Sequence, residues 1–179
     1  SSRRRHTRYG TVTGVQTCAL PISQSRGEAL TIGSFFEPAS SRVALDFEAS
    51  RETATSGDAQ SSRYLHFATH GILDDQHPNF SGLALSQFSA DGKSVDGFLR
   101  MPDIFQLKLA AEVVVLSACE SAVGKEIKGE GLMALTRGFL YAGSARVVAG
   151  LWKVDDFATS QLMQEFYRQM ILRSEEHTS

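Results

Sequence analysis

The sequence predicts an α/β protein built on a mostly parallel sheet, and three observations carry this prediction. Apolar runs rich in β-branched or aromatic residues are typical of buried strands at 64–68, 112–117 and 146–151. Apolar residues recur at helical spacing over 130–141, and again after residue 156. A strand, helix, strand, helix order at this spacing is typical of parallel strands joined by crossover helices.

The elements before the first of these strands are predicted to be shorter. Apolar residues within 27–36 indicate a helix, and Pro38 to Ser41 break it. The following residues predict three further elements: a strand over 42–47, a short helix over 48–55 and a polar loop over 56–62. Tyr64–Ala68 is then bounded by Gly71, as expected of a strand.

The middle of the chain is predicted to form a hairpin and a short helix. Asp91-Gly92 is a hairpin turn signal between a strand over 83–86 and a return over 97–99. Pro102 suits the first turn of a helix that runs to Leu107. Gly143 is expected to end the helix over 130–141 as its C-cap.

Composition indicates a soluble globular domain. The chain has 179 residues, of which 42% are hydrophobic and 21% charged. No apolar run approaches the length of about 18 residues that a membrane span needs, and the Arg-rich start lacks the apolar core of a signal peptide. Two cysteines cannot form a disulfide scaffold, so we expect a reducing, cytoplasmic setting.

Both ends of the chain resemble translated sequencing-adapter DNA, namely residues 12–22 and 173–179. One DNA segment accounts for both, because AGATCGGAAGAGCACACGTCT encodes residues 173–179 and its reverse complement, in a shifted frame, encodes Thr17 to Ile22. We therefore expect residues 1–23 to be a disordered artefact, 24–172 a partial natural domain and 173–179 a second artefact.

Leaving out these ends changes the charge balance. It reduces 18 basic residues to 13 and 20 acidic residues to 18, which gives a net charge near −5. No basic cluster remains, so nucleic acid is not an expected partner. Cys18 falls in the adapter-like segment, which leaves Cys119 as the one natural cysteine.

His70 and Cys119 each follow a predicted buried strand, and parallel α/β sheets form their sites at such strand ends. The separation of 49 residues matches caspase-type arrangements, in which the His precedes the Cys by about 50 residues. A thiol needs a base or cation to become a thiolate at neutral pH, and His70 is the candidate base. The N–H groups of Gly71 and Cys119 are candidate oxyanion donors. The alternative is a buried, inert Cys119 and a structural His70.

Further polar residues flank this pair. His66 lies four residues before His70, and we expect a hydrogen-bonded sheet residue that supports the site rather than a metal ligand. Glu120 either faces solvent or contacts substrate. Glu130 either complements the dipole of the next helix or orients the catalytic loop. Trp152, Asp155 and Asp156 end the next strand. One Asp is expected to cap the last helix and the other to give an acidic pocket for a basic side chain. Trp152 either forms a wall of this pocket or packs in the core.

Six short motifs follow one another in the chain: HFATHG at 66–71, DGFL at 96–99, LSACE at 116–120, GEGL at 129–132, FLYAG at 139–143 and LWKVDD at 151–156. With these motifs, the stretch from Tyr64 to Met170 resembles the CHAT domain, a caspase-like cysteine peptidase domain common in bacteria and often joined to TPR repeats. The segment 47–54 extends the resemblance upstream.

The resemblance implies a caspase–hemoglobinase three-layer sandwich, related to separases and gingipains. It also implies that the sheet is incomplete on its N-terminal side, where the adapter-like peptide stands in place of a further strand. It implies a cysteine endopeptidase with His70 and Cys119 as its dyad, a peptide or protein substrate, no metal or organic cofactor, and control by TPR repeats or a regulatory protein.

Two other hypotheses come from different classes. A catalytically silent interaction or scaffold module in a TPR protein would not need both His70 and Cys119. A Rossmann-like nucleotide binder needs a Gly-rich turn after a strand, and the sequence has none.

Overall fold

The computed structural model describes residues 11–14, 25–117, 119–120, 130–150 and 156–176. Its centre is a five-stranded sheet in the order β2–β1–β3–β7–β9, and every neighbouring pair in it is parallel. The strands are β1 (Thr11–Gly14), β2 (Arg42–Ala44), β3 (Tyr64–Ala68), β7 (Val113–Leu116) and β9 (Val147–Ala149). The predicted α/β architecture with a parallel sheet is confirmed.

A second sheet has the order β6–β5–β4–β8. It consists of β4 (His70–Ile72), β5 (Gly82–Ala84), β6 (Phe98–Arg100) and β8 (Cys119–Glu120). The β4–β5 and β5–β6 pairs are antiparallel, whereas β4 and β8 are parallel. Because β4 follows β3 after one residue and β8 follows β7 after two, two neighbours in the main sheet continue as neighbours in the second.

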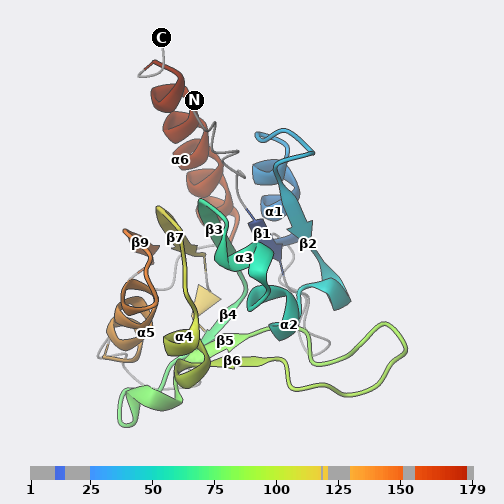
Figure 1. Cartoon of the computed structure of the whole chain (residues 1–179), viewed down its shortest axis with the longest axis vertical. Helices are drawn as coiled ribbons and strands as arrows, with labels where there is room; N and C mark the ends of the chain where they lie inside the picture. The colour runs from blue at the N-terminus through green and yellow to red at the C-terminus, as the bar shows by residue number, and fades with distance from the viewer. Residues whose placement is uncertain (1–10, 15–24, 118, 121–129, 151–155, 177–179) are drawn as a thin grey trace, which may run out of the picture.

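Side chains of β3 alternate between two cores, one on each face of the main sheet. Tyr64 points to the core beneath α1 (Ser25–Gly33) and α6 (Asp156–Glu176), whereas Leu65 and Phe67 point to the other core. That second core also contains residues of α4 (Met101–Gln106), α5 (Glu130–Tyr141) and the second sheet. In Figure 1, α1 and α6 accordingly stand apart from α4 and α5.

Four short helical turns complete the described part of the chain: η1 (Asp46–Glu48), α2 (Arg51–Ala54), α3 (Gly57–Gln60) and η2 (Pro78–Phe80). The prediction of a polar loop over 56–62 is wrong, because α3 lies within this range. Its N-cap is Ser56, whose side-chain oxygen accepts a hydrogen bond from the Ala59 N–H. A Ser N-cap satisfies an otherwise unpaired helix donor, and Ser50 does the same for α2.

The N-terminal segment differs from the sequence-based expectation. Residues 1–23 are expected to be disordered, yet residues 11–14 form β1, which pairs with β2 on one side and β3 on the other. The described sheet therefore contains a strand at the position where one is expected to be missing. The physical reason is that ladder hydrogen bonds use backbone groups, so a segment without proline can occupy this position whatever its origin.

Helical periodicity overestimates the apolar faces of three helices. Leu30 in α1, Leu140 in α5 and Leu162 in α6 are all at least 46% exposed, although all three belong to the apolar residues of the predicted helices. Helix α6 buries Tyr167 and continues to Glu176, into the segment expected to be an artefact. Strand β9 is half-buried rather than buried because it lies at the edge of the sheet.

No helix in the described ranges has both the length and the apolar character needed to cross a bilayer.

Candidate functional site

His70 and Cys119 are direct partners across two neighbouring parallel strands. In the β4–β8 ladder, His70 lies opposite Cys119 and Gly71 lies opposite Glu120. Both strands begin just after the main-sheet strands β3 and β7 end, so the pair sits at the carboxyl end of the main sheet. Sites in open α/β sheets form at this end. The backbone therefore brings the sequence-predicted pair together from positions 49 residues apart.

The turn from β3 into β4 is held by Thr69. Its side chain is fully buried, and its hydroxyl donates a hydrogen bond to the Ala84 carbonyl in β5. This bond joins the residue between the two strands to the neighbouring strand of the second sheet. His70, which follows directly, is half-buried, and Gly71 is buried between β5 and β8. The segment that presents the His is therefore fixed on two sides.

The other predicted site residues are placed to different extents. Trp152 and Asp155 lie outside the described residues. Glu120 and Asp156 are described by backbone only, at β8 and at the first residue of α6. Glu130 is the exposed first residue of α5, where a carboxylate complements the helix dipole.

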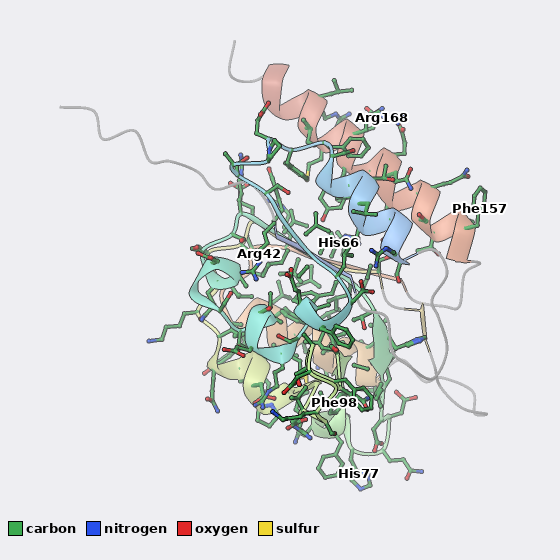
Figure 2. All side chains as sticks on the ribbon, turned by 90° about the vertical axis from the view of Figure 1, so that its right-hand side faces the viewer. Arg42, His66, His77, Phe98, Phe157 and Arg168 are labelled. Atoms are coloured by element: carbon green, nitrogen blue, oxygen red, sulfur yellow. The ribbon has the colours of Figure 1, made fainter. Side chains whose placement is uncertain are left out.

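His66 is engaged on the face of the main sheet that carries α1 and α6. Its Nε2 lies 2.7 Å from Oε1 of Glu28, and both side chains are almost fully buried. Its ring packs edge-on against Tyr167 of α6, with the centroids 5.5 Å apart. Burial raises the pKa of the Tyr167 phenol well above its ordinary value. His66 is thus a hydrogen-bonded residue of the main sheet whose described contacts join α1, β3 and α6, and its support of the site stays a prediction. In Figure 2 it lies in the interior while His77 projects from the far end.

Sequence reasoning missed several polar residues that make long-range contacts, and two of them contact a predicted site residue or the helix that follows the site. Glu28 is one, buried against His66 from a helix 38 residues away. Asp75 is the other, because its Oδ1 accepts a hydrogen bond from the Gly131 N–H at the start of α5. No local sequence pattern predicts either contact, because each contact joins segments that are far apart in the chain.

Two cavities lie in the described part of the molecule away from His70. One, of about 800 Å³, is lined by Phe35, Phe36, Val43 and Tyr64 among others, at the opposite end of β3. The other, of about 510 Å³, is polar and lies beside the ion pair between Arg51 and Asp103. Within the described residues, no group of three or more His, Cys, Asp or Glu side chains is placed to hold a metal ion.

Comparison with known proteins gives a family and two relatives. The sequence model of the CHAT domain family matches residues 4–176. Tetratricopeptide repeat protein 28 of Mus musculus is 37% identical over 73 residues, which cover 41% of this chain and 3% of that protein. The Homo sapiens protein of the same name is 29% identical over 96 residues, which cover 50% of this chain and 4% of that protein.

The chain therefore spans a small fraction of the length of these relatives, both of which are named for their tetratricopeptide repeats. The association of the domain with TPR proteins is thereby confirmed. Both relatives are mammalian, so a bacterial source for this chain stays a prediction, as do the domain bounds 24–172.

Proposed function

We propose, on the premise that this chain belongs to the CHAT domain family, that it is a cysteine endopeptidase domain with His70 and Cys119 as its dyad. CHAT domains are members of the caspase-like cysteine peptidase superfamily, and the finer caspase–hemoglobinase three-layer arrangement is part of the proposal. The observation that carries it is the direct pairing of His70 with Cys119 across β4 and β8.

The proposed chemistry begins with proton transfer. The imidazole of His70 takes the thiol proton of Cys119, and the resulting thiolate attacks the carbonyl carbon of a peptide bond. The negative charge that develops on the carbonyl oxygen is received by the N–H groups of Gly71 and Cys119, a kind of donor whose removal typically costs about 10²–10³-fold in rate. The imidazolium then protonates the leaving amine, and water hydrolyses the thioester, which restores the thiol.

Substrate recognition is proposed to involve the residues around the ends of the neighbouring strands. Glu120, Trp152, Asp155 and Asp156 would form an acidic pocket for a basic side chain. Glu130 and His66 would support the catalytic segment. We further propose a cytoplasmic, reducing location, since the mechanism needs a free thiol, and control of the domain by TPR repeats of the longer protein.

The test is labelling of the thiol in the whole chain. A peptide carrying an alkylating group should label the parent protein, and Cys119→Ala should abolish the label. His70→Ala should slow labelling by at least about 10²-fold, the lower range for loss of a positioned base. The matched control is Cys18→Ser, which removes the other cysteine and should leave labelling unchanged.

Three results would count against the proposal. Equal labelling of the parent and Cys119→Ala would exclude Cys119 as the nucleophile. Equal rates for the parent and His70→Ala would exclude His70 as its base. A folded parent whose Cys119 reacts no faster than free cysteine would favour the alternative, a catalytically silent interaction module in a TPR protein.

A further inference from the structure

The start of α5 is held by a carboxylate from a distant segment. The Gly131 N–H donates to Oδ1 of Asp75 over 2.9 Å, although the two residues are 56 positions apart. The first N–H groups of a helix have no partner within it, and a carboxylate at this end also complements the helix dipole. Asp75 is therefore an N-terminal partner for α5 that comes from outside the helix.

The same junction is closely packed. A Cβ on Gly131 would lie 3.0 Å from Oγ of Ser81 and 3.1 Å from both the Asp74 nitrogen and Leu73 Cβ. Ser81 is fully buried, and its hydroxyl accepts from the Asp74 N–H over 3.0 Å. A side chain at 131 would therefore push the helix start away from the segment 73–81 by a few tenths of an ångström, or require Ser81 to shift.

This junction and the catalytic pair connect the same two stretches of chain. Asp75 lies five residues after His70, and Gly131 lies twelve residues after Cys119. His70 is paired with Cys119 across β4 and β8, and Asp75 is bonded to Gly131. The chain that leaves Cys119 is therefore anchored at its two ends to one short segment, 70–75, which begins with the candidate base.

We propose that Asp75 is a positioning residue for the thiol reaction, which keeps the Cys119 strand in register with His70 by holding the start of α5. This inference rests on the proposed function, because it concerns the reactivity of the same cysteine. In this proposal Asp75 acts through Gly131, from whose N–H it accepts, and takes no part in the bond-making step. A displacement of about 1 Å at a reacting group can cost about 10²-fold in rate, so a modest loosening is enough to be measured.

The experiment measures the rate of alkylation of Cys119 by iodoacetamide as a function of pH, in the whole chain carrying Cys18→Ser. Asp75→Ala should slow the reaction at neutral pH by about tenfold to a hundredfold. It should also move the pH midpoint upward toward the value of a free thiol, about 8.5. Asp75→Asn keeps an oxygen that can accept from Gly131 N–H, and should restore the rate to within about threefold of the parent.

Asp74→Ala is the matched control. It removes an equal charge from the neighbouring position, where the described contacts of the carboxylate stay within its own loop. These are the N–H groups of Gln76 and His77 and the His77 ring, whose Nδ1 lies 3.7 Å from Oδ2. A loss of stability alone would therefore affect both alanine variants, whereas only Asp75→Ala should change the pH midpoint.

Gly131→Ala is an independent variant that keeps Asp75 but separates the helix start from Ser81, and it should reproduce the slow reaction. It decides the matter if Asp75→Ala does not fold. The inference is overturned, while the proposed function stands, if the parent thiol is activated and the Asp75 and Gly131 variants react like Asp74→Ala. A parent thiol without activation overturns both.

Discussion

Replacing Glu28 with leucine should destabilise the protein by about 3 kcal/mol. The Glu28 carboxylate is 2.7 Å from Nε2 of His66, and both side chains are at most 5% exposed. Leucine has nearly the volume of glutamate, so the change removes the polar contact with little loss of packing. The Nδ1 of His66 already has no partner within the described structure, and the variant would leave both ring nitrogens buried and unpaired.

The magnitude follows from the burial of the pair. A hydrogen bond that involves a charged group contributes about 1.5–3 kcal/mol, and an unpaired buried group carries a desolvation cost of similar size. Both ranges have an upper value of about 3 kcal/mol, and we take this value as the expected loss of unfolding free energy. For a chain of this length, 1 kcal/mol corresponds to about 2–4 °C in the unfolding midpoint. Thermal unfolding followed by circular dichroism should therefore show a fall of about 6–12 °C.

A double-mutant cycle separates this contact from general damage. His66→Leu alone should also be destabilising, because it leaves the Glu28 carboxylate buried without its partner. The double variant replaces both polar groups by apolar ones, so it should lie within about 1 kcal/mol of the parent protein. Strict additivity of the two single changes, or a fall of less than about 2 °C for Glu28→Leu, would refute the argument.

Three other predictions concern positions outside this pair. Val12→Pro should lower the urea midpoint of unfolding, because β1 is flanked by two strands and proline removes a ladder donor; no change would show that β1 contributes nothing to stability. Gly143→Ala should lower the free energy of unfolding by more than about 1 kcal/mol, because Gly143 has φ +113° and a Cβ would lie 2.5 Å from the Leu109 carbonyl oxygen. An unchanged free energy of unfolding in a denaturant titration would contradict this. Burial raises the pKa of Tyr167, so stability should be independent of this group below pH 10 and fall above it, where only the unfolded chain releases the proton. Tyrosinate absorbance should show Tyr167 ionising only on unfolding, and its ionisation in the folded protein would be the contrary result.

Local patterns in the sequence were sufficient for most of the architecture. The strands β3 and β7 and the helix α5 lie where apolar runs and helical spacing predict them. Gly143 ends α5 with a positive φ, as its position predicts. The rule that parallel strands place their carboxyl ends at one edge also predicted that His70 and Cys119 would meet.

Periodicity was a weaker guide to burial than to secondary structure. Leu140 and Leu162 fit the helical spacing but remain exposed. A helix buries only the part of its apolar stripe that another element covers, and the width of that cover is decided by the neighbours. For the same reason the sequence could not indicate that β9 would be half-buried at the edge of the sheet.

The sequence by itself determined the order of strands and helices, the resemblance to the CHAT domain and the two strand ends that carry the candidate dyad. Only the tertiary structure decided that this pair lies in a second sheet, that β1 takes a place between β2 and β3, and that Glu28 and Asp75 meet His66 and Gly131. The physical reason is the distance along the chain over which each kind of interaction acts. Periodicity and turn chemistry act within a few residues, whereas a buried polar group bonds to whichever distant segment packs against it.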